Sequence, residues 1–152
     1  MNQLRFRTET TRNGVGALTP EVDGASLTAL VRSYEEQRGY SPAGEYDGIV
    51  PEHFNFGDLS LYYLGIEANQ WPQPGEAWLL GCECGEAGCW PLAARITVEC
   101  SLVVWSNFKQ PHRPDWDYAN FGPFTFDRHQ YEQAVADGIA RAKPSALPQE
   151  GS

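Results

Sequence analysis

Residues 77–105, AWLLGCECGEAGCWPLAARITVECSLVVW, form the stretch around which we expect the rest of the fold to be built. Its first part, residues 77–84, is mostly apolar and predicts a buried strand. Its last part alternates between apolar and polar residues, which predicts a strand with one face on the core. The apolar positions of this alternation are Ile96, Val98, Cys100, Leu102 and Val104. We therefore expect one long strand, in which Cys100 is a small buried side chain.

The turn between these two predicted strands holds three of the four cysteines of the chain. If the strands pair as a hairpin, residues 85–88 form its tip and Cys84 faces Cys89 across the neck, with Cβ atoms roughly 4.5 to 5.5 Å apart. Cys82 lies two residues before Cys84 and therefore points to the same face of its strand. The sequence predicts that the three sulfur atoms converge, as the thiolate ligands of a zinc ion do.

A tetrahedral zinc site needs a fourth ligand, and His112 is the nearest histidine in sequence, with His129 and His53 as more remote candidates. Zinc is thus one candidate cofactor, in a Cys3His site with the ligands Cys82, Cys84, Cys89 and His112. The spacing C-x-C-x4-C differs from the usual C-x2-C pair of zinc sites. Two alternatives therefore stay open, which are buried reduced thiols and a regulatory disulfide.

The same turn resembles the C-G-x-C-W string of papain-like thiol proteases, since it contains C-G-E-A-G-C-W. Its spacing is one residue longer, and no His and Asn follow at the required separation, so we discard this assignment. A small hydrolase or thiol enzyme is still an alternative. Its catalytic candidates are His112, Asp115 and Cys89, because an imidazole can activate a thiol or share a proton with a carboxylate.

A polar and aromatic stretch follows at residues 110–118, QPHRPDWDY. Aromatic side chains beside an arginine are typical of binding hot spots, so we expect a binding surface here. Its predicted members are Arg113, Trp116, Asp117 and Tyr118. In the alternative interpretation the aromatic side chains pack over the sheet, and Arg113 pairs with Asp115 or Asp117.

The charge balance restricts the partners of the chain. Eleven basic residues against 20 acidic ones give 11 − 20 = −9, and a negative protein repels the phosphate backbone of nucleic acids. A basic protein is the partner that this charge favours, because opposite net charges speed encounter. The N-terminus has no apolar signal segment, and no run of roughly 18 apolar residues occurs. We expect a cytoplasmic protein that binds neither nucleic acid nor membrane.

The N-terminal part predicts two strands and a helix. Residues 4–9 alternate and predict a strand, and residues 15–22 predict a short or irregular return strand because Gly16 and Pro20 interrupt it. A helix follows between a capping Asp23 or Ser26 and Gly39. Its apolar stripe consists of Leu27, Leu30, Val31 and Tyr34. Its solvated face is predicted to carry Arg32, Glu35, Glu36 and Arg38.

Two long loops and a last helix complete the prediction. Residues 39–57 and 106–124 hold no period and are rich in glycine, proline and aromatic residues. Asp127 and Gln130 resemble a capping box ahead of a helical stripe that includes Tyr131. The predicted fold is α+β, a mainly antiparallel sheet with two helices packed on one face. It forms a single domain, residues 1–143, and residues 144–152 form a flexible C-terminal tail.

The C-terminal half resembles uncharacterised bacterial proteins, frequent in actinobacteria, that share the run LLxCxCGxxGCWPL followed by VxWxxFxQPHR, WxY, GPFxFDR and QYExA. Here these motifs occupy residues 79–92, 103–113, 116–118, 122–128 and 130–134. The resemblance implies no catalytic residue, because that family has no assigned function.

These observations favour a small acidic binding or interaction domain without catalytic activity, in which the cysteine turn has a structural role. Three alternatives are kept beside it. They are a zinc-binding protein, a toxin-immunity-like inhibitor of a basic protein, and the small hydrolase or thiol enzyme described above.

Overall fold

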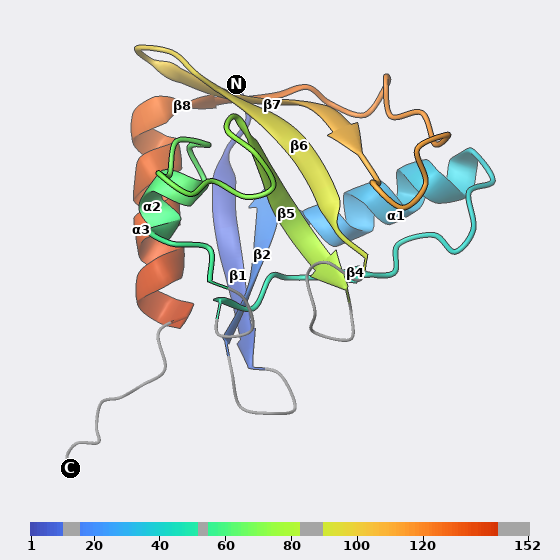
Figure 1. The fold of residues 1–152 in the computed structure, drawn as a ribbon, viewed down its shortest axis with the longest axis horizontal. Helices are drawn as coiled ribbons and strands as arrows, with labels where there is room; N and C mark the ends of the chain where they lie inside the picture. The colour runs from blue at the N-terminus through green and yellow to red at the C-terminus, as the bar shows by residue number, and fades with distance from the viewer. Residues whose placement is uncertain (11–15, 52–54, 83–89, 143–152) are drawn as a thin grey trace.

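The computed structural model describes residues 1–10, 16–51, 55–82 and 90–142, which form two antiparallel sheets and three helices (Figure 1). The sheets have the orders β1-β2-β3 and β4-β5-β6-β7-β8. The strands are β1 Leu4–Thr10, β2 Gly16–Val22, β3 Ala25–Ser26, β4 Tyr46–Asp47, β5 Glu76–Cys82, β6 Leu92–Val98, β7 Leu102–Lys109 and β8 Phe124–Asp127. The helices are α1 Leu27–Gln37, α2 Leu59–Tyr62 and α3 Arg128–Ala142. The predicted α+β class is confirmed, whereas the predicted tail lies outside the described residues.

The strand of residues 77–84 was predicted to pair with the strand that contains Ile96. This pairing forms, with β5 and β6 as its antiparallel partners. Trp78 pairs with Ala93, and Glu76 pairs with Arg95. Every residue of β5 is buried, because this strand lies inside the five-stranded sheet and its polar residues pair within the protein. Residues 83–89, which join the two arms and include Cys84 and Cys89, lie outside the described residues.

The prediction of one long strand through residues 96–104 is wrong. The chain reverses at residues 99–101, so that β6 and β7 pair with each other and Val98 lies opposite Val103. The backbone N–H of Glu99 donates to the carbonyl of Leu102 at 2.8 Å and closes the turn. Alternation alone cannot distinguish a straight strand from two strands whose pattern continues across a short turn. Cys100 is exposed on this turn, so its predicted burial is also wrong.

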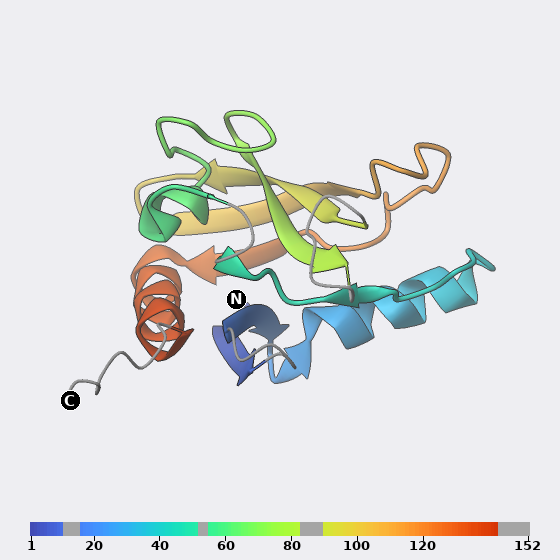
Figure 2. The same ribbon diagram turned by 60° about the horizontal axis from the view of Figure 1, so that its bottom comes forward.

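The fold has two layers (Figure 2). The five-stranded sheet forms one layer, and α3, the three-stranded sheet and α1 lie along one side of it. Trp105, Phe126 and Tyr131 are fully buried in the core. The indole N–H of Trp105 donates to the hydroxyl of Tyr131 at 3.0 Å, and that hydroxyl donates to the backbone carbonyl of Tyr63.

α3, which with 15 residues is the longest described helix, is too short and too polar to cross a bilayer, as are the other two described helices.

The return strand β2 is more regular than predicted. It pairs with β1 along its whole length, from Leu4 opposite Val22 to Thr10 opposite Gly16. Pro20 is tolerated because it lies between the two places where the other edge of β2 is paired, Leu18 with Ile49 and Glu21 with Ser26. No described residue pairs with Pro20 on that edge, so the missing backbone N–H costs no hydrogen bond there.

The predicted loop at residues 39–57 joins the two sheets. Within it, Tyr46 of β4 pairs with Cys82 at the end of β5. Ile49 then exchanges two backbone hydrogen bonds with Leu18 of β2, at 2.8 and 3.0 Å. Tyr46 and Ile49 are both buried. Residues 46–49 of this loop thus contribute to the core and connect the two sheets.

The predicted helix starts are confirmed. The backbone N–H of Ala29 donates to Oγ of Ser26 at 3.1 Å, and that of Gln130 donates to Oδ2 of Asp127 at 2.9 Å. In the middle of α3, Gly138 lies against β1, and a Cβ atom at this position would lie 2.8 Å from Cβ of Phe6. Helix α3 and strand β1 therefore lie closer together than a residue with a Cβ atom at position 138 would allow.

Gly138→Ala is expected to lower the free energy of unfolding by about 1 to 3 kcal/mol, because its methyl group overlaps with Phe6. Helix propensity alone would raise this free energy by about 1 kcal/mol. Ala136→Gly, at an exposed position of the same helix, is the matched control and is expected to cost about 1 kcal/mol. Chemical denaturation measures both variants. A Gly138→Ala variant at least as stable as the wild type would contradict this packing.

Candidate functional site

Three segments far apart in the sequence meet at one end of the molecule. They are the last turn of α1 with the loop that follows it, residues 110–123 after β7, and Trp90 ahead of β6 (Figure 1). Ring contacts connect them, since Tyr40 stacks on Trp116 and Trp116 contacts Trp90 edge to face. This end of the molecule contains the predicted binding residues, and we describe it from its buried base outward.

The base of the site is the carboxylate of Glu35, which is completely buried in α1. It accepts hydrogen bonds from the backbone N–H of Gly44 at 2.7 Å, the hydroxyl of Tyr46 at 2.7 Å and the hydroxyl of Tyr118 at 2.5 Å. Gln110 adds a hydrogen bond from its amide to the hydroxyl of Tyr46 at 3.1 Å. No Lys, Arg or His side chain forms an ion pair with Glu35 in the described part of the chain. Hydroxyl and amide donors therefore compensate its burial.

The two tyrosines of this network are held in their protonated form. Burial raises the pKa of Tyr46 well above its ordinary value, and the negative charge of Glu35 adds to the shift. Burial also raises the pKa of Tyr118, together with the hydroxyls and carboxylate around it. Each hydroxyl therefore stays protonated and can donate its hydrogen bond to Glu35 over the whole physiological range of pH. The network fixes α1, the residue 40–46 segment and the residue 110–118 segment to one another.

The solvated face predicted for the first helix is partly wrong, because it included Glu35. The buried residues of α1 are Leu27, Val31 and Glu35, which are spaced by four and lie on one face. This spacing was the available signal. The chemistry that permits the burial was not visible, because its donors come from residues 44, 46 and 118.

Above this base lies the aromatic–arginine surface, which we define as Tyr40, Trp90, Arg113 and Trp116. The rings of Tyr40 and Trp116 are nearly parallel, with centroids 4.7 Å apart. The rings of Trp90 and Trp116 are nearly perpendicular, at 81°. The guanidinium carbon of Arg113 lies 4.8 Å from the ring centre of Trp90 and 6.0 Å from that of Trp116. The arginine therefore forms cation–π contacts in the corner between two indoles.

The alternative pairing of Arg113 with Asp115 or Asp117 does not occur. Arg38 lies closest to Asp117, with Nη2 and Oδ2 3.7 Å apart. The backbone of Asp117 is held as well, since its N–H donates to the hydroxyl of Tyr40 at 2.8 Å and its carbonyl accepts from the hydroxyl of Tyr34 at 2.7 Å. The bonds that Tyr40 accepts from Asp117 and Arg38 lower the pKa of Tyr40. The loop is thus fixed by Tyr34 of α1 and by Arg38 and Tyr40, which follow this helix, and not by Arg113.

The catalytic candidates do not form a reactive pair in the described part of the chain. His112 stacks on Trp90, with ring centroids 6.2 Å apart. The carboxylate of Asp115 is exposed and has no hydrogen-bond or ion-pair partner among the described residues, so it does not orient His112. Cys89 lies outside the described residues. A hydrolase or thiol enzyme that uses these residues stays a prediction.

The zinc ligands are divided in the same way. Cys82 is buried at the end of β5, His112 is exposed, and Cys84 and Cys89 lie outside the described residues, as does His53. Within residues 1–10, 16–51, 55–82 and 90–142, no three His, Cys, Asp or Glu side chains are grouped to hold a metal ion. His129 lies in the first turn of α3, which lies at the opposite end of the molecule from residues 110–123 (Figure 1).

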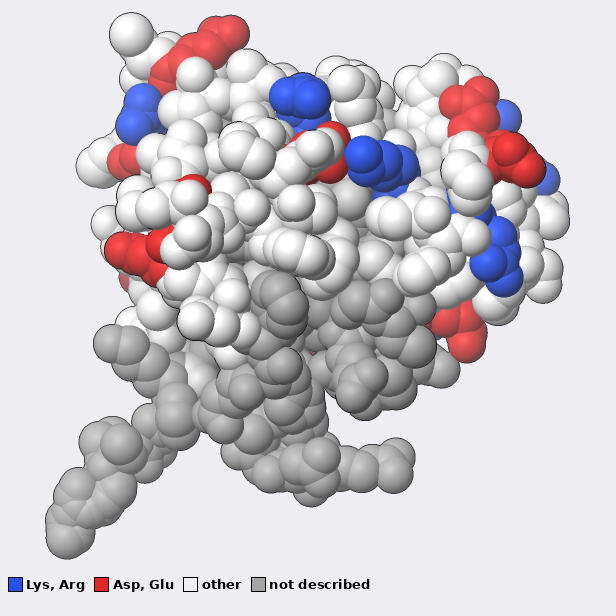
Figure 3. Space-filling model, in the orientation of Figure 1, with Lys and Arg blue, Asp and Glu red and all other residues white. Residues whose placement is uncertain are grey.

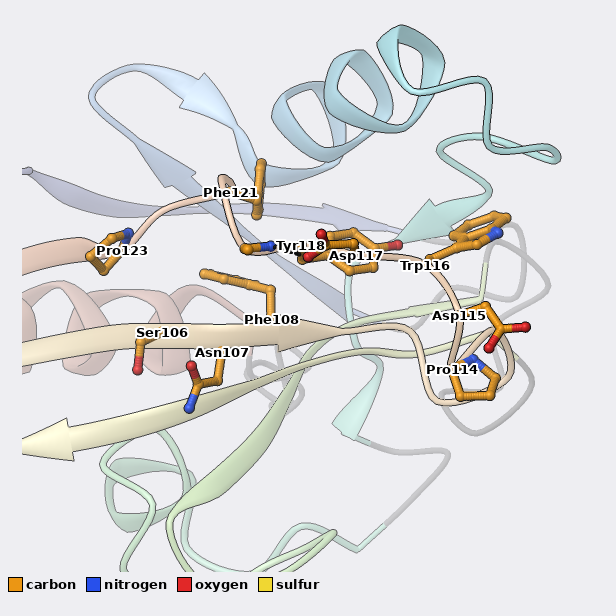
Figure 4. A pocket seen from close by; sticks show the side chains of 11 residues that line it. Ser106, Asn107, Phe108, Pro114, Asp115, Trp116, Asp117, Tyr118, Phe121 and Pro123 are labelled. Atoms are coloured by element: carbon orange, nitrogen blue, oxygen red, sulfur yellow. Dashed lines mark hydrogen bonds between the residues drawn. The ribbon is translucent and has the colours of Figure 1, made fainter.

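A pocket of about 620 Å³ lies beside the aromatic–arginine surface, between residues 106–108 of β7 and the loop 114–123 (Figure 4). Of the predicted site residues, Asp115, Trp116, Asp117 and Tyr118 line it. Its strand wall is available because β8 pairs with β7 only as far as Trp105. There Asn107 adopts a left-handed backbone, with φ of 50°, where the register between β6 and β7 shifts. Non-glycine residues in this conformation at a bulge often occur at functional sites.

Comparison of the chain with protein-family models, with curated proteins and with solved structures finds no match. The resemblance of the C-terminal half to uncharacterised bacterial proteins therefore stays a prediction.

The buried tyrosines predict a loss of stability at alkaline pH. Burial raises the pKa of Tyr46, Tyr62, Tyr63, Tyr118 and Tyr131. Below pH of about 10 both the folded and the unfolded state keep these protons, so their contribution is fully present. As the pH rises further the unfolded chain ionises while the folded protein resists, and the free energy of unfolding falls.

Denaturation between pH 8 and pH 11 measures this slope. The slope of the unfolding free energy against pH reports how many protons the unfolded chain has lost relative to the folded protein. In Tyr118→Phe this number is expected to be smaller by about one. Tyr40→Phe is the matched control, because the pKa of Tyr40 is lowered and its loss cannot reduce the slope. Identical slopes in the wild type and Tyr118→Phe would contradict a protonated Tyr118.

Proposed function

We propose that this chain is a protein-binding domain whose interaction surface is the aromatic–arginine surface of Tyr40, Trp90, Arg113 and Trp116. One observation carries the proposal: three distant segments bring their aromatic and arginine side chains together, partly or fully exposed, on a buried base. Tryptophan, tyrosine and arginine dominate the binding energy of protein interfaces. They lose little conformational entropy on binding when stacking already holds them in place.

The base supports binding more than chemistry. Glu35 is completely buried and bound by three donors, so it cannot reach a substrate. Its role in the proposal is to keep the loop ahead of the surface in one conformation. Tyr118, predicted as a surface member, is also buried and acts in this supporting layer.

The proposed partner is a basic protein, because the chain carries a net charge of −9 and opposite charges speed diffusional encounter. Figure 3 shows acidic and basic side chains interspersed on one face of the molecule. The charge would therefore steer association through the field of the whole protein, while the aromatic rings supply the contact energy. An inhibitor of a basic toxin, of the immunity-protein type, is one form that such a domain can take.

Trp116→Ala is expected to abolish binding of the partner. The tagged protein is used to retain proteins from the cells that naturally contain it, and retained proteins are compared among the wild type, Trp116→Ala and a control. Trp71→Ala is the matched control, since Trp71 is 43% exposed and belongs to another loop. A basic protein retained by the wild type and the control should be lost with Trp116→Ala. With the purified partner, the dissociation constant should rise roughly 30-fold, the size of a hot-spot residue.

Arg113→Ala tests the same surface without removing a packed ring, and it should weaken binding of the partner as well. Equal retention by all four proteins would contradict the proposed surface.

A structural zinc ion is a second candidate function that one contact favours. Trp90, which follows Cys89 directly, stacks on His112. The residue that follows Cys89 and the predicted fourth ligand are thus neighbours in space, which supports a Cys3His site. The ligands in this proposal are Cys82, Cys84, Cys89 and His112.

Elemental analysis of protein purified without added metal tests this second candidate. We expect about one zinc per chain in the wild type and its loss in a variant in which Cys84 and Cys89 are both serine. Cys100→Ser, which changes the exposed thiol on the β6–β7 turn, should leave the zinc content unchanged. A wild-type content near zero would exclude the site.

A further inference from the structure

We infer that the 620 Å³ pocket between β7 and the loop 114–123 receives a basic side chain, arginine or lysine, of the bound partner. This inference rests on the proposed binding function and names the chemistry that the partner presents. The pocket adjoins the aromatic–arginine surface and shares Trp116 with it. A partner lying on that surface is therefore within reach of the pocket.

The charge of the pocket selects a cation. The residues that line it include the acidic residues Asp115 and Asp117, and no Lys, Arg or His is among the described residues that line it. Arg38 approaches Asp117 only to 3.7 Å, and 62% of the Asp117 side chain is exposed. Asp115 has no charged partner at all in the described ranges. A carboxylate that no internal cation neutralises, in a protein of net charge −9, favours a positively charged group at this position.

The walls of the pocket suit the carbon chain of a basic side chain. Phe108, Tyr118 and Phe121 lie in its middle, between the end near Asp115 and the end near Ser106 (Figure 4). The rings of Phe108 and Phe121 contact each other edge to face, with centroids 4.9 Å apart. Lysine and arginine bury their methylene groups on such apolar surface while the charged end stays near water and carboxylates. Trp116 adds an aromatic ring at the charged end, where it can attract a cation.

The far end of the pocket provides polar groups. Ser106 and Asn107 line it there, from the part of β7 that β8 leaves unpaired. The left-handed backbone of Asn107 is an uncommon conformation for a non-glycine residue. The volume of the pocket is in the range of sites that bind small ligands, roughly 300 to 1,000 Å³, so there is room in it for one basic side chain.

Nuclear magnetic resonance titration of the whole chain tests this inference with defined probes. The probes are arginine and lysine blocked as N-acetyl methylamides, and the equally blocked citrulline, which has nearly the shape of arginine but no charge. The readouts are the indole N–H signal of Trp116 and the side-chain amide signal of Asn107. Asp115→Asn removes the proposed counter-ion. Glu99→Gln, at the exposed turn between β6 and β7, is the control with the same change of charge.

The blocked basic residues should shift both signals saturably in the wild type and in Glu99→Gln. Citrulline should bind the wild type about tenfold more weakly, and Asp115→Asn should bind arginine about tenfold more weakly. Equal shifts with citrulline, unchanged affinity in Asp115→Asn, or no saturable shift at all would overturn the inference. Retention of a partner that depends on Trp116 is a separate result, so it would preserve the proposed function if only the pocket failed.

Discussion

The buried carboxylate of Glu35 is the constraint on which the candidate site depends. A carboxylate removed from water needs donors, and here they come from a backbone N–H and two tyrosine hydroxyls on two other segments. Each hydrogen bond to a charged group contributes roughly 1.5 to 3 kcal/mol. Satisfying Glu35 therefore requires residues 44–46 and 118 to take fixed positions. The stacked rings above them are placed as a consequence.

The same segment links this site to the rest of the fold. Tyr46, a donor to Glu35, belongs to the edge strand of the five-stranded sheet, and Ile49 bonds to the three-stranded sheet. A short stretch of chain thus connects the carboxylate, the sheet edge and the second layer. This arrangement explains how a surface made of loops is held in place by the strands that support it.

Much of the fold was predictable because its signals are local. Ser26 and Asp127 cap helices through bonds to residues three positions away, and β1 and β5 show their patterns within seven residues each. The turn at residues 99–101 was missed because its polar residues continue the alternation of the flanking strands. Glu35 was missed because its partners lie 9 to 83 residues away. The loop 110–118 was identified by composition, but its stacking on Tyr40 and Trp90 depends on tertiary contacts that no local pattern contains.

Amide hydrogen exchange in Glu35→Gln tests the central role of the buried carboxylate most directly, with Glu36→Gln, at the adjacent exposed position, as its control. The amide of glutamine keeps one acceptor oxygen but replaces the other with an NH2 group, so at least one of the three donors of Glu35 faces another donor. In Glu35→Gln we expect exchange at the amides of Gly44, Asp117 and Phe121 to accelerate by a much larger factor than exchange at the amides of α3. In Glu36→Gln we expect no such difference. Protection at these three amides that changes only in parallel with α3 would contradict the account.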